Sequence, residues 1–241
     1  MIATIEDHPT RVCIITAAHN PFDQRVFYKE AVSLAEAGLD VTIIGPAHEH
    51  QRGCYRGVYL EPVPVPSSRW WRFLSHGRFL RLAWRMQADI YHFHDPELLP
   101  IGCILRAVGR CVVYDAHENF PAVALSRTWV PRLLRRPLSL MVDVTERIMA
   151  CRLNVVIWVV DEQQARFREC RFTAVYNFPR LKWFHPWPCP EAASQEAELI
   201  HVGSLSRERG SHFLLEVMRE LHRTHPTVRL NALGVLPYAC R

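Results

Sequence analysis

The chain has 241 residues, enough for one large domain or two small ones, and a core of that size needs no covalent cross-links. Hydrophobic residues make up 49% of it and charged residues 22%, which is ordinary for a globular protein. The formal net charge is +5, carried almost entirely by arginine, whose planar guanidinium suits phosphate-bearing ligands. No uncharged apolar run approaches the roughly 20 residues that cross a bilayer, and the N-terminus lacks a signal-peptide pattern. We therefore expect neither a membrane span nor a secreted precursor.

The eight cysteines are scattered, and no two of them form a CxxC pair. Cys13, Cys103 and Cys111 lie inside apolar runs, a pattern typical of small core residues in a reduced compartment. We expect a cytoplasmic protein, either soluble or peripheral on the inner face of the membrane.

Strands and helices alternate from the N-terminus onward. Residues 11–17 (RVCIITA) form a short β-branched apolar run, typical of a strand buried on both faces. Residues 22–37 carry apolar side chains at helical spacing and stop at Gly38, and residues 41–45 (VTIIG) predict the next strand. The same patterns predict strands at 89–94, 111–115, 155–160 and 173–177, and helices at 70–87, 97–108 and 138–151. This alternation predicts an α/β fold with a doubly wound, mainly parallel sheet and helices on both faces.

The alternation stops at residues 179–197, which contain four prolines and end in a polar stretch. Because proline withholds a backbone donor and fixes φ, this segment cannot continue a central strand. We expect a first domain at 1–178, a proline-rich linker at 179–197 and a second domain at 198–241.

The second domain is expected to be truncated. Residues 199–210 (LIHVGSLSRERG) predict a strand, a phosphate-type turn and the start of a helix, and residues 228–235 predict one more strand. A complete doubly wound domain needs about 100–150 residues. The short segment must therefore pack on the first domain, find a partner or stay partly disordered.

Polar clusters follow three of the predicted strands, at residues 19–25 (HNPFDQR), 92–97 (HFHDPE) and 115–119 (DAHEN). Ligands of parallel α/β sheets bind beyond the carboxyl ends of the strands, so we expect the three clusters to open onto one crevice. A structural alternative exists for each one. Asp95 followed by Pro96, for example, would make a good helix start.

A metal site is a further alternative for these clusters. His92 and His94 alternate on one strand face and could bind zinc together with His117. The short metal-binding spacings found on helices are absent, and Pro96 already explains the local sequence. A metal hydrolase is therefore the weakest of the functional hypotheses.

The ordered series HNPFDQRVFYKEAVSLAEAGLDVTIIGP, ADIYHFHDPELLPIG, VVYDAHENFP, VYNFP and HVGSLSRERG resembles a family-4 glycosyltransferase of the GT-B fold. The resemblance runs from about residue 11 to residue 236. It implies two Rossmann-like domains, of which the first holds the acceptor and the second a nucleotide-sugar donor. It also implies transfer with retention of anomeric configuration, with no metal and no other cofactor.

The resemblance suggests roles for single residues. His117 matches the family histidine that contacts the donor sugar, and the alternative is a loop histidine hydrogen-bonded to a carbonyl. We take Asp95 as the second catalytic candidate. Residues 19–25 correspond to the loop that closes over the donor phosphates and the acceptor. The candidates there are Asn20, Asp23 and Arg25, with Glu118 beside them. The alternatives are loop capping, helix-side packing and a surface role for Asp23 and Arg25.

The turn at residues 203–210 resembles the family's donor-diphosphate turn. Gly203 lets the backbone approach the phosphates, and Arg209 takes the place of a basic residue that clamps the diphosphate. Many members have another basic residue at Ser204, and Arg207 could compensate for it. The family's paired glutamates are expected beyond residue 241.

Residues 67–85 are basic and aromatic. One interpretation is an interfacial helix that contacts anionic lipid through Trp70, Trp71, Arg78 and Arg81. The other, which we favour, is a crossover helix whose stripe of Phe73, Leu80 and Trp84 meets the sheet. Nothing else supports a nucleic-acid partner for this segment.

Together these features predict a transferase that moves a sugar from a nucleotide-sugar donor to a glycan or lipid-linked acceptor, in cell-surface polysaccharide or glycolipid biosynthesis. The main alternative is a truncated, inactive remnant that acts at most as a binding module. The metal hydrolase with His92, His94 and His117 remains the third hypothesis.

Overall fold

The structure is a computed structural model that describes residues 8–64, 69–127, 129–184, 198–206 and 209–234, without the side chains of residues 69–75. The chain separates into two compact units, Met1–Trp183 and Phe184–Arg241. Within the described residues, no helix combines the length and the apolar composition needed to cross a bilayer.

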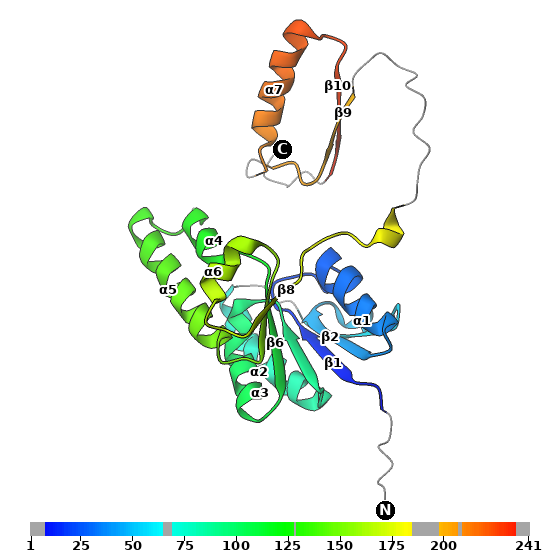
Figure 1. Ribbon diagram of the computed structural model, residues 1–241, viewed down its shortest axis with the longest axis vertical. Coiled ribbons are helices and arrows are strands. Elements are labelled where there is room, and N and C mark those ends of the chain that lie inside the picture. Colours follow the sequence, from blue (N-terminus) through cyan, green and yellow to red (C-terminus); the bar gives the residue numbers. More distant parts are fainter. Residues whose placement is uncertain (1–7, 65–68, 128, 185–197, 207–208, 235–241) are drawn as a thin grey trace, which may run out of the picture. The chain divides into compact units, whose positions relative to one another are not determined.

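The first unit is built on a single sheet (Figure 1). Its strands are β1 (Arg11–Ile15), β2 (Asp40–Pro46), β3 (Gly53–Tyr55), β4 (Val58–Val63), β5 (Ile90–Phe93), β6 (Cys111–Ala116), β7 (Val155–Trp158) and β8 (Phe172–Ala174). They lie in the order β3-β4-β2-β1-β5-β6-β7-β8, and every pairing is parallel except that of β3 with β4. β1 is central, since its Val12 faces Val41 of β2 on one side and Ile90 of β5 on the other.

Helices connect successive strands of this sheet. The longer segments are η1 (Gln24–Ala31), α1 (Val32–Glu36), α2 (Arg69–Met86), α3 (Leu99–Ala107), α4 (Phe120–Ser126), α5 (Arg132–Ala150) and α6 (Gln164–Phe167). Short 3-10 turns are η2 (Glu49–Gln51), η3 (Pro96–Leu98), η4 (Asp161–Gln163) and η5 (Leu181–Trp183).

The core lies on both faces of the sheet, because alternate residues of each buried strand point in opposite directions. Ile14 and Ile43 pack with Phe27 of η1 on one face. Ile15 and Phe93 pack on the other, in the cluster whose further members come from α2, α3 and α5. Helices therefore cover both faces, which confirms the predicted doubly wound α/β fold.

A hairpin at the edge of the sheet was not predicted. β3 and β4 are joined by Arg56 and Gly57, which both have positive φ (53° and 80°), the geometry of a tight turn that suits twisted strands. The sequence pattern does not predict β4, because Glu61 and Pro62 interrupt its apolar run. The short helices α4 and α6 were not predicted either.

The helix predicted at residues 22–37 begins at Gln24, and its first part is a π-helix rather than an α-helix. Its i→i+5 hydrogen bonds widen the turn, so residues five apart come nearly into line. Arg25 and Glu30 are five apart, and their side chains meet at 2.9 Å between Nε and Oε1. In an α-helix they would point about 140° apart.

The face of α2 that meets the sheet differs from the predicted one. Phe79 and Ala83 are buried, whereas Trp84 is 49% exposed. The expected stripe is therefore wrong at Trp84, although Leu80 does pack against the core. Arg78 and Arg81 are exposed, and the side chains of Trp70, Trp71 and Phe73 lie outside the described residues.

The first unit extends to Trp183, beyond the expected boundary at residue 178, because ion pairs hold this segment on the preceding helices. Arg180 and Lys182 both pair with Glu36 of α1, and Lys29 of η1 binds the side chain and backbone of Asn177.

A disulfide joins Cys151, just after α5, to Cys170, just before β8. This pair was not predicted from the sequence, and the interpretation of the cysteines as unpaired core residues does not extend to it. Cys13 is buried as expected, while Cys103 and Cys111 are half-buried. The cross-link closes a loop of 19 residues, a length for which loop-closure entropy suggests about 3 kcal/mol of stabilisation.

The second unit contains β9 (Glu198–Val202), α7 (Ser211–Thr224) and β10 (Arg229–Leu233), with β9 and β10 parallel (Figure 1). This is the strand, helix and strand that the sequence predicts. Of its described hydrophobic side chains, only Met218 and Val228 are buried.

Candidate active site

Three loops meet at the carboxyl ends of the neighbouring strands β1, β5 and β6. The ring centroids of His19 and His117 lie 4.9 Å apart, and those of His94 and His117 lie 5.6 Å apart. The expectation that the three polar clusters converge on one pocket is confirmed. β1 and β5 pair in parallel, as do β5 and β6, so their ends lie at the same edge.

Asp95 binds the loop that follows β1. Its Oδ2 accepts hydrogen bonds from Thr16 Oγ1 (2.8 Å), Ala17 N (2.7 Å) and Ala18 N (3.2 Å), and its Oδ1 lies 3.0 Å from His19 Nδ1. Burial opposes ionisation of Asp95, but the His19 charge and these donors outweigh it and lower its pKa to about 2. Asp95 and Pro96 do begin the short helix η3, as the structural alternative predicts, but the Asp95 side chain makes no capping hydrogen bond there.

His19 is a cation at the mouth of the site. Hydrogen bonds to Asp95 and Glu118 raise its pKa to about 10 despite partial burial. Its Nε2 lies 3.4 Å from His117 Nε2 and 3.9 Å from Glu118 Oε1. The pKa of Glu118 is lowered by the nearby His19 cation, so this carboxylate stays ionised.

His117 is a neutral imidazole with fixed tautomer. Burial lowers its pKa, the Asp115 carboxylate opposes this effect, and the positive His94, His19 and Arg25 add to it. Its Nδ1 lies 3.3 Å from the backbone oxygen of Asp115, to which it donates, and Nε2 accepts from the His19 cation. A chain of contacts thus runs from Asp95 through His19 to His117.

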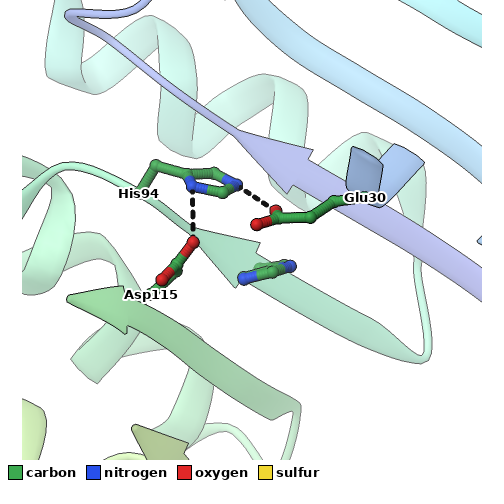
Figure 2. Close-up of side chains that lie close together, drawn as sticks. Glu30, His94 and Asp115 are labelled. Atoms are coloured by element: carbon green, nitrogen blue, oxygen red, sulfur yellow. Dashed lines mark ion pairs between the residues drawn. The ribbon is translucent and has the colours of Figure 1, made fainter. Parts of the chain in front are cut away.

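A second, deeper network lies below this chain. His94 is fully buried between two carboxylates, with Nε2 3.2 Å from Glu30 Oε2 and Nδ1 3.3 Å from Asp115 Oδ2 (Figure 2). Arg25 completes the network: its guanidinium binds both oxygens of Asp115, at 2.7 and 3.0 Å, and also contacts Glu30. Burial opposes the charge on His94, but Glu30 and Asp115 raise its pKa to about 10.

The deeper network balances two cations, Arg25 and His94, against two anions, Glu30 and Asp115. His94 and Arg25 hold the pKa of Asp115 well below its usual range in spite of burial. His92, beside this network at 4.7 Å between ring centroids from His94, is neutral because burial and the His94 charge lower its pKa to about 4.

Two groups of side chains within the described residues have the spacing of metal ligands. They are Glu30, His92, His94 and Asp115, and His19, His117 and Glu118. The first already holds the Arg25 guanidinium, and a cation in the second would have to displace the proton of His19. The three histidines of the hydrolase hypothesis fall into different groups, so they do not form one ligand set.

The remaining loop candidates hold the backbone in place. Asn20 Oδ1 accepts from Phe22 N, and Asp23 Oδ1 accepts from Arg25 N and Val26 N at the start of η1. For Asp23 and Arg25 the geometry favours the capping and packing alternatives. Glu118, by contrast, is 45% exposed and faces the site.

The expected donor turn lies in the second unit. Gly203 has φ 148° and its N–H donates to Leu233 O at 2.9 Å, which ties the turn to β10. Arg209 is exposed just before α7, and Arg207 lies outside the described residues.

Sequence reasoning missed the partners that organise the site. His19 was noted only as part of a cluster, and Thr16 and Glu30 were not noted at all. The position of His19 directly after the first strand was a usable signal for it. Glu30 had none, because its approach to His94 depends on the π-helical winding of η1.

These features define an α/β protein of the doubly wound class with a charged site at the carboxyl ends of its central strands. A sequence model of Glycosyltransferase Family 4 matches residues 24–182. Since the match covers more than half of the chain, the protein belongs to Glycosyltransferase Family 4. No curated protein matches the sequence.

Several solved structures share the fold. Sucrose-phosphate synthase from Thermosynechococcus elongatus matches 95% of this chain over 63% of its own length, at 16% identity and a TM-score of 0.71. HepE from Anabaena, in complex with UDP and glucose, matches 95% of this chain over 62% of its own length, at 15% identity and a TM-score of 0.64. The catalytic domain of starch synthase IV from Arabidopsis thaliana, bound to ADP and acarbose, matches 97% of this chain over 70% of its own length, at 13% identity and a TM-score of 0.62. Such identities show the fold alone, which is the expected GT-B type. The chain spans 63% of the length of the synthase from Thermosynechococcus.

Proposed function

We propose that the protein transfers a sugar from a nucleotide-sugar donor to a glycan or lipid-linked acceptor, with retention of configuration, in cell-surface polysaccharide or glycolipid biosynthesis. We also propose that it works in the cytoplasm or on the inner face of the membrane. The observation that supports transfer best is the chain Asp95–His19–His117, which lies at the carboxyl ends of three parallel strands in a family-4 chain.

His117 would contact the donor sugar. Its Nδ1–H is committed to the Asp115 carbonyl, so the ring is held in one orientation and Nε2 is directed toward His19 at the mouth. A sugar hydroxyl can donate a hydrogen bond to Nε2 in place of His19. Asp95 acts through His19, which it orients and keeps positively charged. A fixed positive charge in a half-buried site can stabilise the negative charge that develops on a leaving phosphate.

Transfer would need no metal, because the His19 cation already supplies positive charge at the mouth. The acceptor would approach the loop at residues 19–25, and the donor diphosphate would bind Gly203 and Arg209, with Arg207 as a further candidate. These donor roles rest on the family resemblance of the turn. The neighbours HepE and starch synthase IV, which hold UDP and ADP, support a nucleotide-sugar donor.

The proposal is tested by incubating the purified chain with a panel of nucleotide sugars and with glycan and lipid-linked acceptors. His117→Ala is expected to lower transfer by about 100-fold or more, as loss of one preorganised polar contact does elsewhere. His50→Ala is the matched control, because His50 is an exposed histidine of η2 that lies outside the clusters at residues 19–25, 92–97 and 115–119. Transfer that survives His117→Ala unchanged would refute the assigned role.

The second candidate is a binding module without transferase activity, favoured by the small second unit with one described helix and two described strands. The two candidates differ in nucleotide binding. Calorimetry with UDP and ADP should give micromolar binding if the donor site works. Absence of heat together with absence of transfer would support the binding module.

A further inference from the structure

Helix α5 presents an apolar face to solvent. Leu133 is 91% exposed, and the other members of this face are between 43% and 64% exposed: Leu134, Leu140, Met141, Val144 and Ile148. At 100° per residue, the six side chains fall within an arc of about 120° on a helical wheel. The opposite side of the helix anchors it, with Glu146 and Ala150 buried. We call the six exposed residues the outer face of α5.

Such a continuous exposed apolar face marks a binding surface, because single scattered leucines are ordinary but a stripe along a whole helix is not. α5 lies at the outside of the first unit, next to α4 (Figure 1).

One flank of the outer face is positively charged. Arg132, Arg136 and Arg147 follow it on the helical wheel, and Arg132 and Arg136 are exposed. The acidic residue among them, Asp143, is already held by Arg166 at 2.8 Å and lies 3.8 Å from Arg147. The flank therefore offers net positive charge, carried at its surface by Arg132 and Arg136, beside apolar side chains.

The other flank opens into a cavity of about 350 Å³ between η3, α4 and α5. Its walls are mostly apolar, with Pro96, Phe120 and Met141 among them, and Glu97 and Thr145 are two of the polar members. Met141 belongs to both the cavity and the outer face, so the two surfaces are continuous.

The cavity also adjoins the candidate active site. Pro96 and Glu97 directly follow Asp95, and Phe120 comes three residues after His117. A hydrocarbon chain in this cavity would leave its polar end near the carboxyl ends of β5 and β6, which Asp95 and His117 follow.

We propose that α5 is an interfacial helix whose outer face lies on an anionic lipid surface, and that the adjoining cavity takes the hydrocarbon chain of a lipid-linked acceptor. A lipid surface meets both needs of the helix, since hydrocarbon covers the leucines and anionic head groups pair with the arginines. A second copy of the chain would cover the leucines, but it would not neutralise the arginines, because it would add further arginines beside them. The acceptor part of the proposal rests on the proposed transferase function, whereas the lipid surface does not.

The first test is flotation of the full chain with phosphatidylcholine vesicles, with and without phosphatidylglycerol. The wild type is expected to bind the anionic vesicles and to dissociate at high salt. Leu133→Gln/Leu140→Gln should lower binding by about tenfold or more, because two exposed side chains lose their apolar burial. Arg132→Gln/Arg136→Gln should remove the preference for anionic vesicles.

Two control variants separate this surface from others. Ile104→Gln changes a half-exposed apolar residue on α3, and Arg78→Gln/Arg81→Gln removes two exposed arginines of α2. Both are expected to bind vesicles as the wild type does. Unchanged binding of the leucine double variant, or loss of binding only in the α2 variant, would overturn the proposal. A dimer in solution that the leucine double variant abolishes would also overturn it, since a second copy would then cover the face.

The cavity is tested with dodecyl phosphate below its micelle concentration, by calorimetry. Thr145→Trp places a large side chain at an exposed position of the cavity wall and should weaken binding by about tenfold or more. Equal binding by wild type and Thr145→Trp would refute the chain-binding role. Neither assay needs a donor or turnover, so a failed transferase assay with intact lipid binding would reject only the proposed function.

Discussion

Asp95 controls the charge at the mouth of the site. It is 1% exposed, accepts three hydrogen bonds from residues 16–18 and contacts His19. The carboxylate and the imidazolium stabilise one another, so the folded protein gains stability whenever both are charged. This gain has a definite pH range.

We predict that Asp95→Asn changes the acid stability of the protein. The pKa of Asp95 is lowered to about 2 in the folded state, against about 4 when unfolded. Its contribution is therefore present above pH 4 and is lost as the pH falls through 2, and two pK units correspond to about 3 kcal/mol. Urea unfolding from pH 6 to pH 2.5 should show a smaller loss in the variant than in the wild type. Asp40→Asn, an exposed control, should follow the wild-type curve. Parallel curves for Asp95→Asn and wild type would contradict the assignment.

The buried network behaves as one unit, because each of its charges compensates another. We predict that Asp115→Asn lowers the free energy of unfolding at pH 7 by about 3–5 kcal/mol, the usual result of removing one partner from a buried pair. It leaves Arg25 and His94 with Glu30 as their single anion.

Double-mutant cycles test this coupling. Asp115→Asn/His94→Gln also removes the surplus cation, so its loss in the urea unfolding free energy should be smaller than the sum of the two single losses. Strictly additive losses would show that the two side chains do not compensate one another.

At the scale of the elements, the residues that follow each strand were predictable from the sequence, but the contacts that those residues make with one another were not. Asp95 and His117 were placed correctly at strand ends, because the βα alternation fixes which residues follow each strand. The contact of Asp95 with His19, between residues far apart in sequence, needs the order in which β1, β5 and β6 pair. The outer face of α5 was missed because composition drew attention to residues 67–85, whereas exposure depends on which side of each helix packs.

The close packing of β2 against the first loop gives a prediction for a single glycine. A Cβ at Gly45 would lie 2.8 Å from Pro21 Cγ and 3.1 Å from Thr16 Cγ2. Gly45→Ala must therefore shift the loop that carries His19, and we expect transfer to fall at least tenfold with little loss of helix content. Gly77→Ala is the control, since a Cβ there meets nothing within 4 Å and alanine favours a helix by about 1 kcal/mol. Steady-state kinetics and circular dichroism check both, and equal kinetics for the two variants would contradict the prediction.

At the scale of the whole molecule, the two units differ in the size of their hydrophobic cores. The first has helices on both faces of its sheet, whereas Ile200, Val202, Phe213 and Leu233 of the second are all more than 60% exposed. The family and the fold were predictable from the ordered motifs and the alternation. The small core of the second unit followed from counting its elements.

We predict that residues 1–183 fold alone and that residues 184–241 do not. A unit with one described helix and two described strands buries too little apolar surface to offset its conformational entropy. Urea unfolding followed by circular dichroism should show a cooperative transition for 1–183 and none for 184–241. A cooperative transition in the shorter fragment would contradict this.

The π-helical winding of η1 bears on how this region can change length during evolution. Arg25 and Glu30 meet because the wide turn brings residues five apart into line. In an ordinary α-helix, residues four apart share a face. A homologue with one residue deleted between the arginine and the glutamate could keep the same pair in a narrower helix. A one-residue gap in an alignment at this position would then be neutral for the ion network and would carry no sign of lost function.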